Sequence, residues 1–243
     1  MLTEEIFRTD SYIKECQASI LSVNNLGGII LDRTNFYPTG GGQPGDSGVL
    51  RLEDGSEITI ATTVKGNGNE NVVHVPAENQ ELPPAGTKVV AVIDWDRRYN
   101  HMQMHTALHL ICNVVPAGVT GNQIGTAKSR MDFDMGDEKL NKEDISEAVN
   151  ALIDANHPTK VDYISDEELD ARPEIIPTMS VAPPRGSGRI RLMKIGDIDL
   201  QPCGGTHVSR TGEIKHIRVT KIESKGKRNR RVSIAFASSM EKN

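Results

Sequence analysis

Two pairs of metal-ligating residues constrain this chain more than any other feature, because they lie far apart in the sequence. His105 and His109 form the first pair, and Cys203 and His207 form the second, each with four-residue spacing. Three imidazoles and one thiolate are the nitrogen and sulfur donors that Zn²⁺ prefers. Neither pair is specific alone, but together they supply a full set of four ligands. The sequence therefore predicts one Zn²⁺ per chain and a fold that brings the two segments to one point.

The two pairs are expected in different kinds of local structure. His105 and His109 lie in an apolar, helix-like run, where residues four apart have Cβ atoms about 5–6 Å from each other. Cys203 follows a proline and precedes two glycines, which is typical of a loop. His101 extends the helical series, but three histidines at this spacing cannot point equally well at one ion. We therefore expect His101 to be exposed or to have a second role.

The pattern around the first pair excludes one class of zinc enzyme. A metalloprotease helix carries its general-base glutamate directly after the first histidine, and here that position is Thr106. A site with four protein ligands is either closed and structural or able to open one position for water or substrate. The sequence leaves both alternatives open.

Residues 1–90 contain short β-rich segments separated by Gly, Asn and Asp, a spacing that favours a small antiparallel barrel. The segment 82–86, with two prolines and a glycine, is the best linker candidate, so we predict a barrel-like domain over residues 1–90 and a second domain over residues 91–243. The strands expected in the first part are 19–23, 28–32, 48–52, 57–60 and 72–75.

Residues 91–243 are expected to form a mixed α/β, zinc-binding domain, which makes the whole chain an α+β protein. The histidine helix should end near residue 115, before Pro116. A second helix is predicted over 142–155, capped by Asn141 and with an apolar stripe of alanines and Leu152. A capping box at Ser165 predicts a short third helix. The strands expected here are 88–94, 124–134, 190–195, 214–222 and 231–237.

A glycine-rich loop lies between two of the predicted barrel strands. Residues 36–48 hold five glycines and two prolines. This composition fits a long flexible turn, or a backbone-lined edge where glycines let a ligand approach closely. No Gly-Lys-Ser/Thr sequence follows, so the loop is not a phosphate-binding P-loop.

Positive charge is concentrated near the C-terminus. The chain has a formal net charge of -5, yet residues 183–231 carry 13 Lys/Arg and 4 Asp/Glu, and five of those cations lie within 225–231. This run is either a solvated turn or a phosphate-binding face. Because few aromatic residues surround it, a structured RNA read by its shape and backbone fits better than a stacked single strand.

The hydropathy pattern and the cysteines indicate the cellular compartment of the protein. No apolar run reaches the roughly 20 residues needed to cross a bilayer, and the acidic N-terminus lacks a signal core. Three scattered cysteines do not describe a disulfide framework. We therefore expect a cytoplasmic protein with no membrane partner, and we make no prediction of its oligomeric state.

Three motifs in a fixed order resemble a known family. They are the glycine-rich loop 36–48, His-Thr-Ala-Leu-His-Leu at 105–110 and Cys-Gly-Gly-Thr-His-Val at 203–208. Together they resemble the editing domain of alanyl-tRNA synthetase, and more closely the free-standing alanyl-tRNA editing proteins of the AlaX type and medium length. The strand Arg130–Asp134 also looks like a family segment, and the resemblance spans residues 30–237.

The resemblance implies ATP-independent hydrolysis of the ester that links a wrong amino acid, chiefly serine and in some members glycine, to the tRNA for alanine. Such a step protects translation fidelity, because an alanine pocket cannot strongly reject an isostere that only adds a hydroxyl. An activated water would attack the ester. Zinc would anchor the substrate or polarise that water, and N–H groups of Gly204-Gly205 would stabilise the oxyanion.

The resemblance also assigns roles to residues of this chain. We expect Thr39, Gln43, His105 and Cys203 to take part in catalysis. The serine should be contacted by Thr39, Gly41, Gly42 and Gln43, and the tRNA by Lys227, Arg228, Arg230 and Arg231. Two alternatives stay open: a deacylase for Ser-tRNA(Thr), because threonyl-tRNA synthetase editing domains share a related pattern, and a non-catalytic, zinc-stabilised RNA-binding module.

Overall fold

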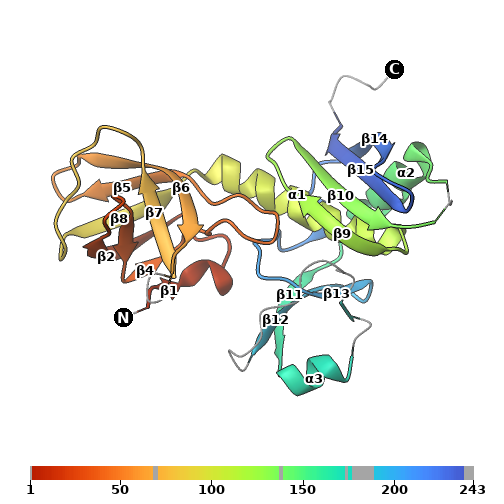
Figure 1. Ribbon diagram of the computed structural model, residues 1–243, viewed down its shortest axis with the longest axis horizontal. Helices are drawn as coiled ribbons and strands as arrows, with labels where there is room; N and C mark the ends of the chain where they lie inside the picture. Colours follow the sequence, from red (N-terminus) through yellow and green to blue (C-terminus); the bar gives the residue numbers. More distant parts are fainter. Residues whose placement is uncertain (1, 68–70, 137–138, 173–174, 177–188, 238–243) are drawn as a thin grey trace. The chain divides into compact units, whose positions relative to one another are not determined.

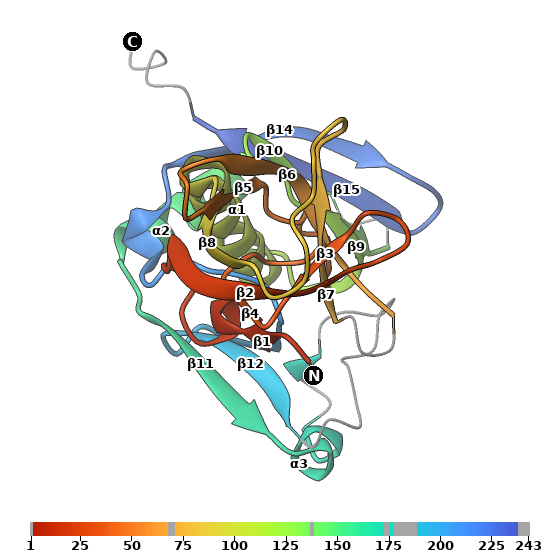
Figure 2. The same ribbon diagram turned by 90° about the vertical axis from the view of Figure 1, so that its left-hand side faces the viewer.

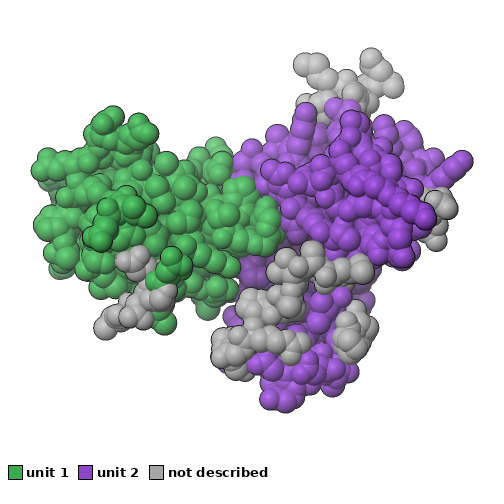
Figure 3. All heavy atoms as spheres, viewed as in Figure 1, with its two compact units in different colours: residues 1–99 green, residues 100–243 purple. Residues whose placement is uncertain are grey.

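The computed structural model of this protein describes residues 2–67, 71–136, 139–172, 175–176 and 189–237. The chain divides into two compact units, Met1–Tyr99 and Asn100–Asn243 (Figure 3). In the part of the chain that is described, no helix combines the length and the apolar character that a bilayer crossing requires.

The first unit is built on a closed six-stranded barrel, which confirms the predicted barrel (Figures 1 and 2). Alternate residues of each strand point into the barrel. Those that fill its interior are apolar, and the following are almost fully buried: Ile20, Leu31, Leu50, Ile60 and Ala91. Every neighbouring pair of strands is antiparallel. In barrel order the strands are β2 (Glu15–Val23), β3 (Ile29–Leu31), β7 (Val72–Pro76), β6 (Glu57–Lys65), β5 (Gly48–Leu52) and β8 (Lys88–Ile93). A short parallel pair, β1 (Glu4–Glu5) and β4 (Arg33–Thr34), accompanies it.

The last barrel strand lies beyond the proline segment that we took as a linker. β8 pairs with β2 and with β5, so it closes the barrel. The proline segment is therefore a turn inside the first unit: the hydroxyl of Thr87 donates to the carbonyl oxygen of Pro84 at 2.8 Å, and the amide of Gly86 donates to that of Ile20 at 2.8 Å. The barrel thus extends past residue 90, and the division of the chain into functional domains stays a prediction.

The helix α1 (Trp95–Val114) contains the division between the units, and the second unit holds two sheets. The larger is antiparallel, in the order β14 (Ile217–Ser224), β15 (Asn229–Phe236), β10 (Lys128–Asp134) and β9 (Gly118–Gln123). The helix α2 (Lys142–Asp154) is tied to β14 by the Asn150 amide, which bonds both the N–H and the carbonyl of Ile217 at 2.9 Å. The smaller sheet has the order β11 (Thr159–Ile164), β12 (Ile190–Ile195) and β13 (Asp199–Pro202), with α3 (Asp166–Asp170) following β11 (Figure 1).

The helix caps in the second unit are confirmed, and two details of the prediction are wrong. Asn141 caps α2, and Ser165 forms the predicted capping box of α3. The buried stripe of α2, however, consists of Ile145, Val149 and Ile153 rather than of alanines and a leucine. The predicted strand 124–134 begins only at Lys128, because residues before it turn back to the unpredicted strand β9.

Candidate metal centre

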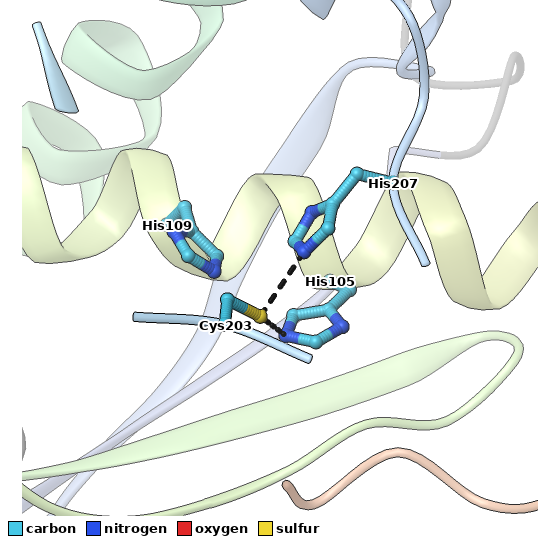
Figure 4. A group of neighbouring side chains, drawn as sticks. All are labelled: His105, His109, Cys203 and His207. Atoms are coloured by element: carbon cyan, nitrogen blue, oxygen red, sulfur yellow. Dashed lines mark hydrogen bonds between the residues drawn. The ribbon is translucent and has the colours of Figure 1, made fainter. Parts of the chain in front are cut away.

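The first pair of ligands is presented by a helix that is buried on every side. Each residue of α1 from His101 to Ile111 is buried, as is typical of a helix in the core of a protein. His105 and His109 lie one turn apart on this helix, with ring centroids separated by 5.4 Å (Figure 4). The expectation of an exposed His101 is wrong: its side chain is 1% exposed, because the helix has no solvent-facing stripe at this point.

The second pair is presented by the loop that follows β13. Cys203 continues the pairing of β13 with β12 by one residue, since its N–H donates to the carbonyl oxygen of Arg191 at 3.1 Å. The guanidinium of Arg191 in turn donates to the carbonyl oxygens of Cys203 at 2.6 Å and Gly205 at 3.1 Å. The chain then places the buried ring of His207 beside the helix.

The four predicted ligands meet at one point. The Sγ atom of Cys203 lies 3.5 Å from Nε2 of His105 and 3.2 Å from Nε2 of His207, and all four ligand atoms lie within 4.8 Å of one another (Figure 4). Tetrahedral zinc with ordinary bond lengths places its donors about 3.3–3.8 Å apart. The cluster therefore has the donor set and nearly the spacing that a tetrahedral ion needs, and we conclude that it could hold a metal ion.

Two side chains outside the ligand set orient the histidine rings. Asp199 Oδ2 lies 2.8 Å from Nδ1 of His109, and Thr106 Oγ1 lies 3.1 Å from Nδ1 of His207. The Thr106 hydroxyl donates to the carbonyl oxygen of Met102 at 2.9 Å, so it accepts from the His207 ring. Both rings thus carry their proton on Nδ1 and turn Nε2 toward Cys203, as in metal sites where an outer partner fixes the tautomer. Neither Thr106 nor Asp199 was identified from the sequence as a partner of a ligand.

The charges of the cluster favour a bound cation. Burial opposes ionisation of Cys203, but the imidazoles of His105 and His207 hold the pKa of this thiol well below its ordinary value. Burial also opposes protonation of His109, yet the hydrogen bonds with Asp199 and Cys203 raise its pKa to about 10. Burial lowers the pKa of His207 to about 3. A cation therefore meets a thiolate and a neutral His207, and the proton on Nε2 of His109 must leave when the cation binds.

The glycine-rich loop belongs to the first unit and is an ordered hairpin. Its neck is closed by Tyr37 and Asp46, whose backbone groups pair at 2.9 Å. At its tip the Gly40 and Gln43 backbones exchange hydrogen bonds of 3.0 and 2.9 Å. Gly41 and Gly42 between them have φ angles of 57° and 81°, the left-handed conformation that favours glycine in a two-residue turn.

The two polar side chains predicted to contact serine differ in their environment. Thr39 is exposed, but its hydroxyl donates to the carbonyl oxygen of Thr63 at 3.2 Å and accepts from the N–H of Gly45 at 2.8 Å. One lone pair of that hydroxyl remains for another donor. Gln43 is fully buried. These residues belong to the first unit and the metal cluster to the second, and their role in catalysis or binding stays a prediction.

The neck of the loop is anchored by a fully buried ion pair that was not predicted. Nε of Arg98 lies 3.0 Å from Oδ2 of Asp46, and the same guanidinium donates to the carbonyl oxygens of Ser11 and Asn35. Asp46 also accepts from the N–H of Tyr37 at 2.6 Å. Both charges are hydrogen-bonded, as buried charges require.

The basic run lies on the hairpin between β14 and β15, and part of its charge is paired. Arg231 donates two hydrogen bonds of 2.7 and 2.9 Å to Asp132, and Arg228 donates two of 3.0 and 3.2 Å to Asp134. The bond from Arg231 lowers the pKa of Asp132. Arg230 donates to the Ser224 hydroxyl at 3.2 Å, and Lys227 is exposed. Paired arginines keep free N–H groups, so these contacts do not prevent phosphate binding.

The sequence matches two family models from the aminoacyl-tRNA synthetases. Residues 190–233 match the model described as threonyl and alanyl tRNA synthetase second additional domain, and residues 5–97 match that of tRNA synthetases class II (A). The first match contains Cys203 and His207, and the second covers the barrel. The two matches thus indicate a protein related to the aminoacyl-tRNA synthetases.

Sequence relatives identify the family within this class of synthetase-related proteins. The chain is 39% identical to the alanyl-tRNA editing protein AlaX-M of Methanosarcina acetivorans, over 95% of this chain and 98% of the relative. It is 34% identical to AlaX-L of Pyrococcus horikoshii, over 93% of the chain and 56% of that protein. The alanine–tRNA ligase of Pyrobaculum neutrophilum is 35% identical over 91% of the chain and 25% of the ligase. The chain belongs to the family of AlaX-M alanyl-tRNA editing proteins.

Proposed function

We propose that this protein is an aminoacyl-tRNA deacylase that removes serine from mischarged tRNA(Ala), with glycine as a second possible substrate amino acid, and that its metal is one Zn²⁺. The observation that carries the proposal is the Cys203–His105–His109–His207 cluster, in which the three histidines are buried and Cys203 is half-buried. Its donors lie within 4.8 Å of one another in a chain of the AlaX-M family. Nitrogen and sulfur donors without a carboxylate favour zinc over magnesium or calcium.

The reaction consumes one water and no ATP. The oxygen of that water attacks the ester carbonyl carbon, and the carbonyl electrons move to the oxygen to give a tetrahedral oxyanion. The bond to the ribose oxygen then breaks, and one water proton ends on that oxygen. A Zn²⁺ held by the four ligands would supply a Lewis acid for this centre. Asp199 and Thr106 hold the two ligand rings in the tautomer that exposes Nε2.

Selection of serine over alanine requires polar groups that recognise a hydroxyl. A site built to hydrogen-bond a hydroxyl rejects the analogue without it by a large factor, because its polar groups are otherwise left unpaired. In our proposal the glycine-rich loop supplies these groups through Thr39, Gln43 and the backbone of Gly41 and Gly42. Lys227, Arg228, Arg230 and Arg231 contact tRNA phosphates, and the reaction takes place in the cytoplasm, where tRNA is charged.

A three-substrate deacylation assay tests the proposal. Purified protein loaded with Zn²⁺ should release serine from Ser-tRNA(Ala) and leave Ala-tRNA(Ala) intact. Faster release from Ser-tRNA(Thr) would show that the substrate is the tRNA for threonine and not the tRNA for alanine. No release from any of the three substrates would favour the non-catalytic RNA-binding module. Cys203→Ala should lower bound zinc well below one per chain and abolish release, whereas full activity without metal would remove the metal from the mechanism.

A further inference from the structure

The loop between Cys203 and His207 is held by one buried arginine that has no role in the function proposed so far. Arg191 is 9% exposed and donates to two carbonyl oxygens of this loop, those of Cys203 and Gly205, from the same Nη1 atom. Its own carbonyl accepts from the N–H of Cys203. Three hydrogen bonds thus join one strand residue to a loop that supplies two metal ligands.

These bonds fix the orientation of the peptide groups. A peptide is planar and trans, so its C=O and N–H point in opposite directions. The C=O of Cys203 points at Arg191, and the N–H of Gly204 in the same plane therefore points away from the guanidinium. Gly204 is exposed, whereas Gly205 is buried.

The neighbouring N–H is already engaged. The amide of Gly205 donates to Sγ of Cys203 at 3.5 Å, which suits a thiolate ligand. Within the described residues, the N–H of Gly204 has no hydrogen-bond acceptor. It is a hydrogen-bond donor at the surface, one residue from Cys203. Its direction is fixed because the Arg191 guanidinium holds the carbonyl oxygen at the opposite side of the same peptide.

We propose that the N–H of Gly204 is the donor that stabilises the oxyanion of the deacylation reaction, and that Arg191 is the positioning residue that aims it. This inference rests on the proposed deacylase function. It assigns the oxyanion contact to Gly204 and leaves the N–H of Gly205 to the thiolate. A donor held in place before the reaction needs no reorganisation when the charge develops on the ester oxygen.

The experiment compares Gly204→Pro with Gly204→Ala. Gly204 does not adopt a positive φ, so its backbone does not require glycine, and of the two replacements only proline removes the N–H. Single-turnover hydrolysis of Ser-tRNA(Ala) should be about 10²–10³-fold slower for the proline variant than for the alanine variant, the loss expected for one oxyanion donor. KM and zinc content should be the same for both. Equal rates in two zinc-loaded variants would overturn the assignment.

The role of Arg191 is tested by Arg191→Met and Arg191→Lys. The methionine variant should lower kcat with little change in KM, and lysine should restore part of the loss, because it can still donate to a carbonyl. Arg210→Met is the matched control, since Arg210 also donates to a backbone carbonyl, that of Asn156 at 2.7 Å, and should keep the wild-type rate. Each variant is loaded with Co²⁺, whose absorption bands report thiolate ligation independently of activity.

A double-variant cycle separates positioning from mere support of the fold. Because Arg191 acts through the N–H of Gly204, the Gly204→Pro variant should lose little more when Arg191 is also changed. Losses that multiply would refute the inference, as would a wild-type kcat in metal-loaded Arg191→Met. If Arg191→Met fails to fold, the lysine variant takes its place in the cycle. Failure of the wild-type protein to hydrolyse Ser-tRNA(Ala) would refute the deacylase function itself, which is a separate outcome.

Discussion

Asp199→Asn should weaken zinc binding although Asp199 is not a ligand. Its carboxylate lies 2.8 Å from Nδ1 of His109, and the two side chains are 8% and 7% exposed. Asparagine has nearly the same shape and can still accept a hydrogen bond, so the substitution removes the charge and little else.

The expected magnitude follows from two opposing effects of that charge. At an effective dielectric constant of about 20, a carboxylate attracts a proton charge about 4 Å away by about 4 kcal/mol, and a double charge about 6.5 Å away by about 5 kcal/mol. Removing the carboxylate makes the loss of the His109 proton easier, which favours metal binding. It also removes the larger attraction between the carboxylate and the divalent ion, which weakens metal binding. The net loss is about 1 kcal/mol, or roughly fivefold in affinity, which lies just below the range of about 10–100-fold typical of such outer partners.

The assay is competition for Zn²⁺ between the protein and a chromophoric chelator at pH 7. Asp154→Asn is a matched control in the same unit, because Asp154 forms a second Asp–His pair with His216 at 2.7 Å that is largely exposed and outside the cluster. This control should bind zinc like the wild type. Equal or tighter binding by Asp199→Asn would refute the reasoning, since the proton effect would then dominate.

Three further predictions concern the loop, the barrel and the basic hairpin. Thr39→Val should slow release of serine at least tenfold and lower stability by about 1 kcal/mol through the unpaired N–H of Gly45, while Thr39→Ser should retain both; an unchanged rate would place serine selection elsewhere. Burial lowers the pKa of His74 to about 4, although its hydrogen bond to the carbonyl oxygen of Ile29 opposes this. The unfolded chain, with an ordinary pKa near 6.5, therefore binds more protons, and the free energy of unfolding should fall by about 2 kcal/mol between pH 7 and 5. Urea unfolding should show that His74→Leu lacks this part of the pH dependence; an identical dependence would contradict it. Replacing Arg228, Arg230 and Arg231 by glutamine should weaken tRNA binding and reduce its logarithmic salt dependence by about 0.9 for each lost phosphate contact, and an unchanged slope would identify the run as a solvated turn.

The four residues of the candidate metal cluster could be predicted from the sequence because their chemistry is rare and their spacing is regular. Helical geometry places His105 and His109 on one face of a helix. Because zinc usually takes four ligands, the second pair, Cys203 and His207, completes the set. Asp199 and Thr106 carry no such signal. Each is a single polar residue whose partner is fixed by tertiary structure, 90 and 101 positions away in the chain.

The errors in the fold have similar physical causes. The prolines before β8 were read as a linker, because a turn inside a barrel and a connection between domains have the same composition. β9 was missed since Gly118 and Gly121 weaken the strand pattern, and its stability comes from pairing with β10. In α2 the alanines formed a periodic stripe, but the larger Ile145, Val149 and Ile153 bury more apolar area and so face the sheet.

Thr106 has a consequence for how a metal ion would be loaded into the cluster. The same hydroxyl that orients the His207 ring also accepts from the N–H of Val208 at 3.3 Å, and Ser209 accepts from the N–H of Thr159 at 2.8 Å. The ligand loop is therefore docked on the helix and on β11 by bonds that do not involve an ion. Small zinc domains fold only when they load, and they lose their structure to a chelator. Here we expect loading to be a local event in an already folded chain, with a rate that follows the exchange of ligands and water around the ion. The same scaffold should then empty and refill without passing through an unfolded state.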